Sequence, residues 1–465
     1  MSPKRPIAEN IVELIGHTPM VKLSRIAHGL NFTLYAKLEF LNPGGSVKDR
    51  IGPAMIDRAE KEGWIKPGGT IIEATSGNTG VGLALCAATR GYKLIVVIPD
   101  KMSAEKIRLM KALGARVIIA PAQVRSDHPA SYYSVAKRLA REVPNSYYTD
   151  QYENDMNPEA HYRTTGPEIY EDLDGKVDAI VAGIGTGGTV SGIGRYFKEK
   201  KAPTRIVAVD PKGSVLAHYA KTREVIQGTA YKVEGIGEDM IPKTVHFQYI
   251  DEFVTTEDKE SFLMARRLAV EEGLFVGGSS GAAVVGALRW AENAHLPDGA
   301  RVVVLLPDSG DRYLSKLYSD EWMRENGLMD ESITAGDMVS TKEFFPQLLS
   351  VSPITTVKDV LGLLYQRNVS QLPVISGDEA VGSVIEEDLL REVIRESSIM
   401  ERSVGGFMGP PFPVVARSAP LRELITKLKA ERAVLVREEV GKDFIGILTR
   451  HDLSAFLIRD TEVDE

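Results

Sequence analysis

The first 330 residues alternate between short apolar blocks and stretches with the pattern of helices. The blocks are rich in β-branched residues and lack strict apolar–polar alternation, which is typical of parallel strands buried on both faces. They lie at 94–98, 117–119, 179–181, 205–209 and 302–306. Helices are predicted between them, for example at 104–113 and 259–272. The pattern predicts an α/β fold with open twisted sheets and functional sites at the carboxyl ends of strands.

A second pattern begins near residue 330, after a polar stretch with the turn pair Asn326-Gly327. Two similar segments follow, each with two apolar strands and then a helix, in which Asp388 and Asp452 hold matching positions. This internal repeat predicts two α+β modules that pack as a pair, because one alone buries its apolar face poorly. The predicted division is a large domain at 1–330, a linker at 331–336, and modules at 337–398 and 399–465.

Composition narrows the function classes. The 465 residues suffice for two or three domains, and a 43% hydrophobic share can fill sizeable cores. No apolar run approaches the about 18 residues of a membrane span, and Met1–Pro6 lacks the apolar core of a signal peptide. Cys86 is the only cysteine, which excludes a disulfide framework, a cysteine-rich zinc site and an iron–sulfur cluster. With a net charge of −8 and no long basic run, we expect a cytoplasmic enzyme with no nucleic-acid partner, no membrane partner and no metal.

One lysine lies in a setting that suits chemistry. Lys48 follows Gly44-Gly45-Ser46 and precedes a predicted helix at 51–61. At a helix start the macrodipole disfavours a second positive charge, so the pKa of this ammonium group is expected to be lowered. A nucleophilic lysine needs such a lowered pKa. The alternative is an ordinary surface lysine after a glycine turn.

Two other loops have the composition of anion sites. Thr75-Ser76-Gly77-Asn78-Thr79-Gly80 follows the apolar block 70–72, and its backbone amides and hydroxyls suit a carboxylate or a phosphate. Its alternative is a helix cap formed by Thr75 or Ser76. The similar loop Gly277-Gly278-Ser279-Ser280-Gly281 by itself indicates a simple helix start.

The loop after the block 179–182 allows two interpretations. Gly183, Gly185 and Gly188 satisfy the G-x-G-x-x-G fingerprint of dinucleotide sites, and Asp210 lies close to the acidic position of a Rossmann fold. However, Gly185-Thr186-Gly187-Gly188-Thr189 surrounds a Gly-Gly pair with two hydroxyls, which fits a terminal phosphate better than a bridging pyrophosphate. The local pattern leaves an NAD site and a phosphate-monoester site equally open.

The combination decides between them. A lysine, a carboxylate-type loop and a phosphate-type loop in one α/β domain suit an aldehyde cofactor that a lysine and a phosphate site hold, acting on amino acids. In this order the motifs resemble those of the fold-type II pyridoxal-phosphate enzymes that carry out β-replacement on serine derivatives. Lys48 matches the lysine that bonds the cofactor, residues 75–80 the substrate-carboxylate loop and residues 185–189 the phosphate loop. The resemblance covers residues 1–320 and implies a core with two open twisted sheets.

Within these enzymes the chain resembles the cystathionine β-synthases. The segment 233–242 has their acidic form, with Glu234 and Asp239, and the C-terminal repeat resembles their paired CBS (Bateman) modules. The resemblance implies pyridoxal-phosphate-dependent condensation of L-serine with L-homocysteine to cystathionine and water, with some hydrogen sulfide production. No haem is expected, because no cysteine precedes Lys48. The alternatives are a cysteine synthase, which uses O-acetylserine and sulfide, and a regulatory binding protein with an inactive catalytic domain.

The resemblance also implies roles for single residues and an oligomeric state. Lys48 would bond the cofactor and move protons, Asn78 would lie beside the cofactor's 3′-oxygen, and Ser279 would meet its pyridine nitrogen. The phosphate would be held by Gly185, Thr186, Gly187, Gly188 and Thr189. The substrate carboxylate would meet Thr75, Ser76, Thr79 and Gln151, while Tyr152 and Gly235 would line the side of the second substrate. A homodimer or homotetramer is expected.

The repeated modules suggest a regulatory site. Residues 446–452 match the ribose-binding pattern of CBS modules, with Thr449 and Asp452 at the polar positions. The first copy departs from it, because Ile385 stands where the hydroxyl belongs and Glu386 and Glu387 would repel phosphates. S-adenosylmethionine or an adenine nucleotide is therefore expected, if at all, at Thr449 and Asp452. A purely structural, dimerising pair of modules is the alternative.

Overall fold

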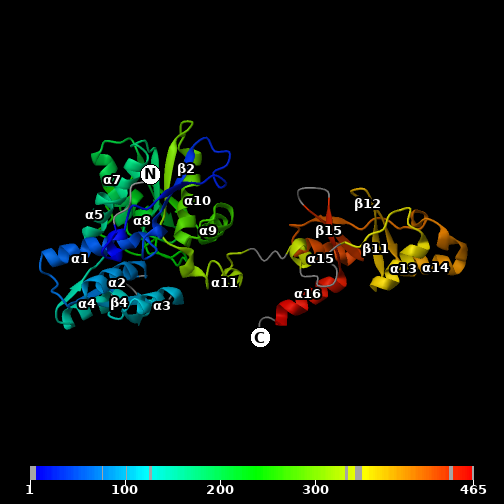
Figure 1. Cartoon of the computed structure of the whole chain (residues 1–465), viewed down its shortest axis with the longest axis horizontal. Helices are drawn as coiled ribbons and strands as arrows, with labels where there is room; N and C mark the ends of the chain where they lie inside the picture. Colours follow the sequence, from blue (N-terminus) through cyan, green and yellow to red (C-terminus); the bar gives the residue numbers. More distant parts are fainter. Residues whose placement is uncertain are drawn as a thin grey trace. The chain divides into compact units, whose positions relative to one another are not determined.

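The computed structural model describes residues 7–75, 77–100, 102–124, 128–329, 334–340, 348–438 and 443–462. The chain divides into two compact units, residues 1–329 and 330–465 (Figure 1). The first unit contains two sheets with helices on their faces, and the second contains two small sheets. In the part of the chain that the structure describes, no helix is long and apolar enough to cross a membrane.

The larger sheet of the first unit has the strand order β1-β2-β10-β7-β8-β9. Its strands are β1 Met20–Lys22, β2 Thr33–Leu38, β10 Arg301–Leu306, β7 Ala179–Gly183, β8 Arg205–Pro211 and β9 Glu252–Thr256. β1 runs antiparallel to β2, and the other neighbours pair in parallel. Alternate residues belong to two cores: Val181 packs with α9 (Asp258–Glu272) and α10 (Gly278–Asn293), and Ile180 with α6 (Thr165–Asp172) and α7 (Gly188–Glu199). Because both faces are covered, the strands carry unbroken apolar runs, as predicted.

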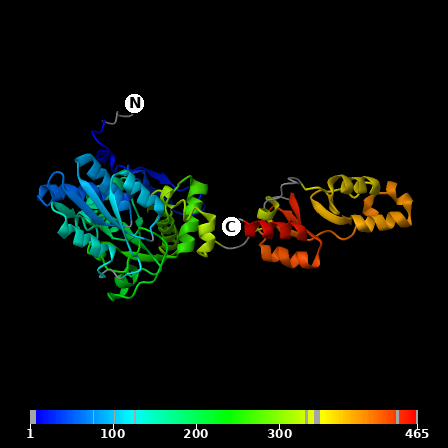
Figure 2. The same ribbon diagram turned by 90° about the horizontal axis from the view of Figure 1, so that it is seen from below.

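The smaller sheet is parallel throughout, in the order β5-β4-β3-β6. Its strands are β3 Thr70–Ala74, β4 Lys93–Pro99, β5 Arg116–Ala120 and β6 Ser146–Tyr148. One face packs with α1 (Ile51–Lys61), α2 (Asn78–Arg90) and α3 (Ala104–Ala112), and the other with α4 (Tyr132–Glu142), so helices lie on both sides of the strands (Figure 2). The predicted α/β class with two open sheets is confirmed.

Each sheet has one place where the strand order reverses. In the smaller sheet the chain turns from β3 to β4 on one side and returns to β6 on the other, so the reversal lies between β3 and β6. In the larger sheet it lies between β7 and β10. Ligands of open α/β sheets bind at the carboxyl ends of the strands at such points. The segments that follow β3, β6, β7 and β10 are therefore the ones expected to build a site.

The second unit contains two copies of one arrangement of helices and strands. The first copy contains α13 (Val357–Arg367), the hairpin of β11 (Gln371–Ser376) and β12 (Glu379–Ile385), and α14 (Glu386–Arg395). The second contains β13 (Val414–Ala416), α15 (Leu421–Ala430), the hairpin of β14 (Ala433–Arg437) and β15 (Phe444–Thr449), and α16 (Arg450–Glu462). Both hairpins are antiparallel and shift register at the matching place, after Val374 and after Val436. The predicted strand–turn–strand–helix repeat is thus present.

Candidate active site

Lys48 lies where the two sheets of the first unit meet. It belongs to the 3₁₀ turn Val47–Arg50, which Ser46 caps by accepting a hydrogen bond from the Lys48 backbone N–H at 3.3 Å. The Val47 N–H donates to Pro307 O at 2.8 Å, which ties the turn to the end of β10. Burial lowers the pKa of Lys48, while the charges of Glu238 and Asp308 act against this. The expected lowering is present, but its main cause is desolvation rather than a helix dipole, since α1 begins only at Ile51.

The lysine faces a large cleft. The cleft has a volume of about 820 Å³ and is lined by Lys48, Gln151, Tyr152, Thr186 and Gly235, among others. Residues predicted from separate loops therefore line one cleft. Thr75, Asn78, Thr79 and Ser279 are not among its lining residues. Lys48 also lines a smaller adjoining pocket with Gly185, Thr186, Gly187 and Thr189.

The phosphate-type loop is built for close approach of an anion. Gly187 has φ 81° and caps α7, so this residue needs the left-handed conformation that glycine tolerates. A Cβ atom at Gly185 would lie 2.9 Å from Gly235 O, and one at Gly188 would lie 1.9 Å from Asn157 Oδ1. Thr186 Oγ1 accepts a hydrogen bond from Asn157 Nδ2 at 2.9 Å. The first-turn amides of α7 have no intrahelical acceptor, so the loop fits the phosphate of a small cofactor.

Asp210, the acidic residue of the dinucleotide interpretation, is not available to bind a ribose. Asp210 stands at the end of β8 but is 1% exposed, and its Oδ2 accepts a hydrogen bond from the Ala217 backbone N–H at 2.8 Å. It thus caps the start of α8 (Leu216–Thr222) instead of presenting a carboxylate to a ribose. Gly188 packs against the Asn157 side chain, not against a neighbouring strand. The geometry therefore favours the phosphate-monoester site.

The carboxylate-type loop meets the segment after β6. Thr79 Oγ1 donates to Gln151 Oε1 at 2.7 Å, and Gln151 Nε2 donates to Ala74 O at 3.3 Å. Thr75 accepts the Gly77 N–H at 3.0 Å, and Gly77 has φ 130°, a conformation that favours glycine. Ser76 lies outside the described residues. The contact between Thr79 and Gln151 joins the two strand ends at the reversal point of the smaller sheet.

Asn78 and Ser279 lie next to the end of β10. Asn78 Nδ2 donates to Asp308 Oδ2 at 2.8 Å, and Asn78 Oδ1 accepts from Arg312. Ser279 is 3% exposed in the first turn of α10, and the Gly277 N–H just before it donates to Asp308 O at 3.1 Å. Asp308 and Arg312 were not predicted from the sequence, although Asp308 lies two residues after the end of β10, at the reversal point of the larger sheet.

Acidic and aromatic groups also line the cleft. Tyr152 is 5% exposed and packs edge-on against Tyr133, with ring centroids 5.2 Å apart. Glu238 and Asp239 line the cleft. Glu234 also lines the cleft, but it is bound by Lys106 and Lys316, each at 2.6 Å. Because two lysines neutralise it, Glu234 is not available for a substrate ammonium, and the acidic contribution falls to Glu238 and Asp239.

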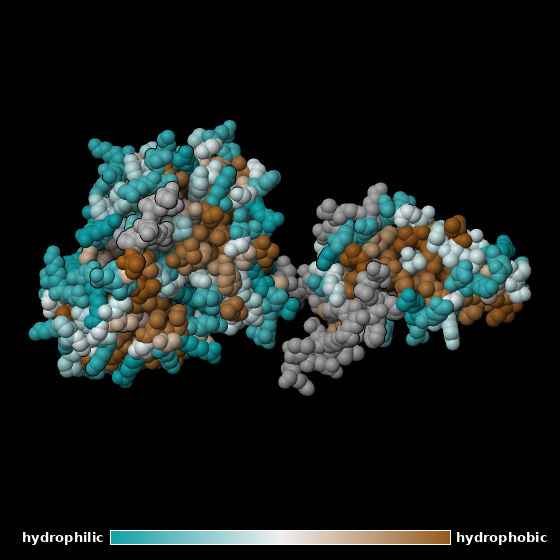
Figure 3. All heavy atoms as spheres, in the orientation of Figure 1, coloured by the Kyte–Doolittle hydropathy of each residue, from teal (hydrophilic) through white to brown (hydrophobic). Residues whose placement is uncertain are grey.

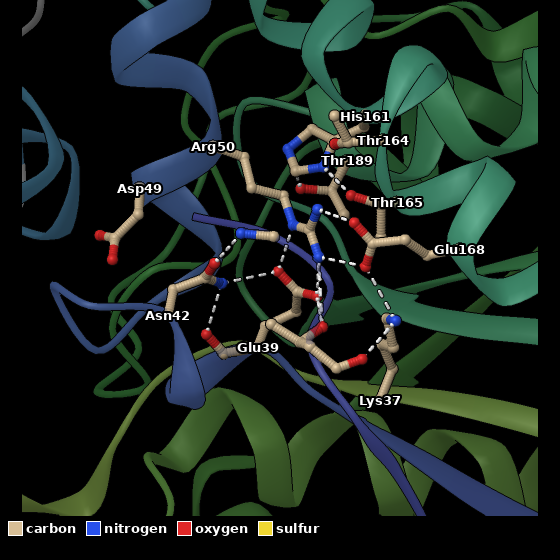
Figure 4. Close-up of polar contacts among 12 residues, drawn as sticks. Lys37, Glu39, Asn42, Asp49, Arg50, His161, Thr164, Thr165, Glu168 and Thr189 are labelled. Atoms are coloured by element: carbon tan, nitrogen blue, oxygen red, sulfur yellow. Dashed lines mark hydrogen bonds and ion pairs between the residues drawn. The ribbon is translucent and has the colours of Figure 1, made fainter. Parts of the chain in front are cut away.

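A buried ion network supports the lysine turn from behind (Figure 4). Arg50 bonds Glu39 at 2.7 Å and Glu168 at 2.6 Å, and Lys37 bonds Glu168 at 2.9 Å. Burial alone would raise the pKa of Glu168, but Arg50 and Lys37 hold it at about 2. The network joins β2, the lysine turn and α6. Sequence analysis did not identify it, because its partners are far apart in the chain.

His161 continues this network to the phosphate-type loop (Figure 4). Its Nδ1 lies 2.8 Å from Thr165 Oγ1, and its Nε2 lies 3.1 Å from Thr189 Oγ1. Burial, together with the charges of Arg50 and Lys48, lowers the pKa of His161 well below its ordinary value. The ring is therefore neutral and holds the Thr189 hydroxyl through one hydrogen bond.

The repeat unit uses its ribose-pattern residues as a helix cap. The backbone N–H and the hydroxyl of Thr449 both donate to Asp452 Oδ2 at 2.7 Å, at the start of α16. The same threonine–aspartate cap occurs at Thr334 and Asp337, where α12 (Ala335–Ser340) begins. The pattern at Thr449 is therefore partly accounted for by local helix capping.

Comparison with known proteins agrees with this geometry. Residues 11–308 match the family model described as "Pyridoxal-phosphate dependent enzyme", and residues 336–395 and 404–459 match the CBS domain model. The chain is 41% identical to a cystathionine beta-synthase of Dictyostelium discoideum, over 99% of this chain and 94% of that protein. It is 46% identical to the Mus musculus cystathionine beta-synthase, over 82% of this chain and 68% of that protein.

The solved structures include a similar one from a bacterium. It is the "O-acetylserine dependent cystathionine beta-synthase from Helicobacter pylori", which is 43% identical and has a TM-score of 0.62. The match covers 67% of this chain and 99% of that one. With the lysine turn, the two anion loops and the paired modules in place, the chain belongs to the pyridoxal-phosphate-dependent enzymes and, within them, to the cystathionine β-synthase family.

Proposed function

We propose that this protein condenses L-serine with L-homocysteine to cystathionine and water, using pyridoxal 5′-phosphate, and that it also releases some hydrogen sulfide. The observation that carries the proposal is the shared cleft. A lysine with a lowered pKa and the phosphate-type loop open onto the same space. Gln151, which is bonded to Thr79 of the carboxylate-type loop, lines the same cleft, as an amino acid and a phosphorylated aldehyde require. The names of the relatives support the same reaction.

The residues of the chain then divide the work. When bound, the cofactor supplies an electron sink for negative charge at the substrate α-carbon. Lys48, whose pKa is lowered, removes the α-proton, protonates the departing hydroxyl and returns a proton at the end. Gly185 to Thr189 would bind the phosphate, Asn78 would lie beside the 3′-oxygen, and Ser279 would meet the pyridine nitrogen. A hydroxyl partner holds that nitrogen less strongly protonated than a carboxylate would, which favours elimination at the β-carbon.

The remaining residues bind the substrates. Thr75, Ser76, Thr79 and Gln151 hold the carboxylate of serine, and the bond between Thr79 and Gln151 keeps two of these groups in register. Tyr152 and Gly235, which line the cleft, face the second substrate. Incubation of the purified protein with serine, with and without homocysteine, and detection of cystathionine by mass spectrometry tests the proposal. Product that forms from O-acetylserine and sulfide but not from serine and homocysteine would favour a cysteine synthase.

Asp239→Ala is expected to reduce activity with homocysteine about tenfold or more while sparing activity with sulfide. Asp239 is exposed and lines the cleft, so it can bind the homocysteine ammonium, whereas sulfide carries no such group. Comparing kcat/KM for the two nucleophiles measures the difference. Glu292→Gln removes an exposed carboxylate on α10 and serves as the control. Equal losses with both nucleophiles would remove Asp239 from the specificity site.

We propose that the modules at 337–398 and 399–465 form a sensor whose adenosyl ligand, S-adenosylmethionine before ATP, binds at Thr449 and Asp452. The acidic residues Glu386 and Glu387 of the first module suit a positive sulfonium better than a polyphosphate. Calorimetry should detect binding to the wild type and a loss of about tenfold or more in affinity in Asp452→Ala. Because Asp452 also caps α16, Asp337→Ala provides a matched control that removes the similar cap of α12. Absence of heat with either ligand would leave the structural role.

We further propose a cytoplasmic homodimer or homotetramer that binds no haem, nucleic acid or membrane. Apolar side chains gather on one face of the first unit (Figure 3). Ile11, Leu14 and Leu41 of this unit are each more than 40% exposed. Contiguous exposed apolar patches mark protein–protein interfaces. Light scattering of the purified protein measures the assembly.

A further inference from the structure

Glu73 is a buried acid that the reaction above does not use. It is 0% exposed and is the next-to-last residue of β3. Only Ala74 separates it from Thr75, the first residue of the substrate-carboxylate loop. The groups that face it are the polar groups of Thr149 and Gln151, the carboxylate of Asp150 and the phenols of Tyr147 and Tyr148. None of these is a cation. An ionised carboxylate here would be buried without an opposite charge, which is costly.

Among the described residues, no cation is one of the main influences on the pKa of Glu73. On β4, the residue paired with Glu73 is Val96. From α4, Lys137 acts on Asp150 and is not among the main influences on Glu73. Burial raises the pKa of Glu73 to about 8, Thr149 and Gln151 counteract part of the rise, and Asp150 adds to it. Among the described glutamates with a shifted pKa, Glu73 is the one whose pKa is raised.

The hydrogen bonds around Glu73 accommodate a proton on its carboxyl group. The Thr149 hydroxyl lies within hydrogen-bond distance of both Glu73 Oε2 and Ile72 O, the latter at 3.1 Å. A hydroxyl has one proton, so it cannot donate to both acceptors. If Glu73 carries a proton, it donates to Thr149 Oγ1, and Thr149 donates onward to Ile72 O. If Glu73 is ionised, the Thr149 hydroxyl donates to it, and Ile72 O keeps the Thr149 backbone N–H. The buried carboxylate then has no cation beside it, and its Oε1 has no hydrogen-bond partner among the described residues.

We propose that Glu73 is a protonated positioning residue, whose neutral carboxyl anchors the Thr149–Gln151 segment beneath the substrate-carboxylate site. Thr149 is tied to β3 through its backbone N–H, which donates to Ile72 O at 3.1 Å, and through the hydroxyl chain described above. Two residues on, Gln151 accepts the Thr79 hydroxyl at 2.7 Å. The proton on Glu73 thereby fixes the side chain that is paired with Thr79. The inference rests on the proposed role of Thr79 and Gln151 in binding the substrate carboxylate.

The direction of the pH effect follows. Above pH 8, Glu73 becomes an anion directly behind a loop that binds another anion, and the hydrogen-bond chain through Thr149 reverses. Binding of serine should weaken, while proton transfer at Lys48 is affected less. If the protonated form alone binds well, the KM for serine rises about tenfold between pH 7 and pH 9, because the competent fraction falls.

Stability should respond to the same proton. The ordinary carboxyl pKa is 4.5, whereas that of folded Glu73 is about 8. Between these values the folded chain holds a proton that the unfolded chain has released, so stability falls as the pH rises through this window. In Glu73→Gln, which mimics the neutral acid, this part of the pH dependence disappears.

The test uses the full-length holoenzyme. Infrared spectra of protein labelled with ¹³C at glutamate carboxyls should contain, at pH 7, the C=O stretch of a protonated acid, which fades above pH 8 and is missing in Glu73→Gln. That variant should retain activity at pH 7, and its KM for serine should stay flat where that of the wild type rises. Glu62→Gln, which removes an exposed carboxylate, is the control and should follow the wild type.

Each outcome of this test either supports or overturns the proposal for Glu73. If the labelled band is missing from the wild type at pH 7, or if Glu73→Gln and the wild type share one KM profile, the proposal is overturned. The infrared band and the melting temperature need no substrate. If the protein proves to use O-acetylserine instead of serine, these two readouts still report on Glu73, and the KM profile is measured with that substrate. The wild-type band remains informative even if Glu73→Gln does not fold.

Discussion

Lys48→Ala should lower the rate of cystathionine formation by about 10²–10⁴-fold or more, since it removes the group proposed to carry each proton transfer. The side chain opens onto the cleft, and its lowered pKa provides the neutral amine that the role requires. Borohydride reduction followed by peptide mass spectrometry should find the cofactor attached at residue 48 of the wild type and at no residue of the variant. Steady-state kinetics with serine and homocysteine measures the loss.

The control for this variant is Lys61→Ala, which removes an exposed lysine in the last turn of α1. Its activity should equal that of the wild type. The circular dichroism of Lys48→Ala should also match the wild type, because the turn is held by the Ser46 cap and the bond to Pro307 rather than by the ammonium group. Near-normal turnover in Lys48→Ala would end the pyridoxal-phosphate mechanism proposed for this site.

Glu168→Ala is expected to lower the free energy of unfolding of the first unit by about 3–5 kcal/mol. The carboxylate of Glu168 accepts hydrogen bonds from Arg50 at 2.6 and 2.7 Å and from Lys37 at 2.9 Å. Its removal leaves two buried cations with fewer acceptors, since Arg50 is 4% exposed and Lys37 is 0% exposed. Denaturant titration, following the transition of the first unit, measures the loss.

Glu159→Ala is the matched control. Glu159 also contacts two cations, Arg163 and Arg195, but their side chains are 68% and 36% exposed, so the loss should be about 1 kcal/mol or less. The pKa of Glu168, about 2, also fixes a pH dependence. The stability it provides is present above the unfolded-state pKa of 4.5 and is lost as the pH falls toward 2, so Glu168→Gln and the wild type should converge in acid. Similar losses in Glu168→Ala and Glu159→Ala would contradict a structural role for the network.

The sequence predicted what depends on local pattern. The apolar blocks became β4, β5, β7, β8 and β10, and the helix expected at 51–61 is α1. The anion loops could be recognised because small residues must stand where a strand turns into a helix. Gly187 illustrates this requirement: its φ of 81° is a conformation that glycine adopts readily and other residues rarely do.

The sequence could not predict which distant side chains pair. Arg50 and Glu168 are separated in the sequence by all four strands of the smaller sheet and by α5 (Met156–Arg163), and no periodicity links them. Glu234 lies in the acidic segment that resembles the cystathionine β-synthases, yet in the structure Lys106 and Lys316 neutralise it. The lowered pKa of Lys48 was predicted in direction, but its main cause, desolvation, depends on tertiary packing. The roles of single site residues remain predictions.

The place of β10 in the larger sheet affects how the chain can be synthesised. β10 lies between β2 and β7, although it is the last strand of the first unit to leave the ribosome. Until residue 306 has emerged, β2 and β7 each lack a neighbour and expose an unpaired edge, a state prone to aggregation. The smaller sheet, in contrast, is complete once residue 148 has emerged. Truncations that end after residue 329 therefore keep the complete larger sheet, whereas those that end before residue 301 lack its central strand β10.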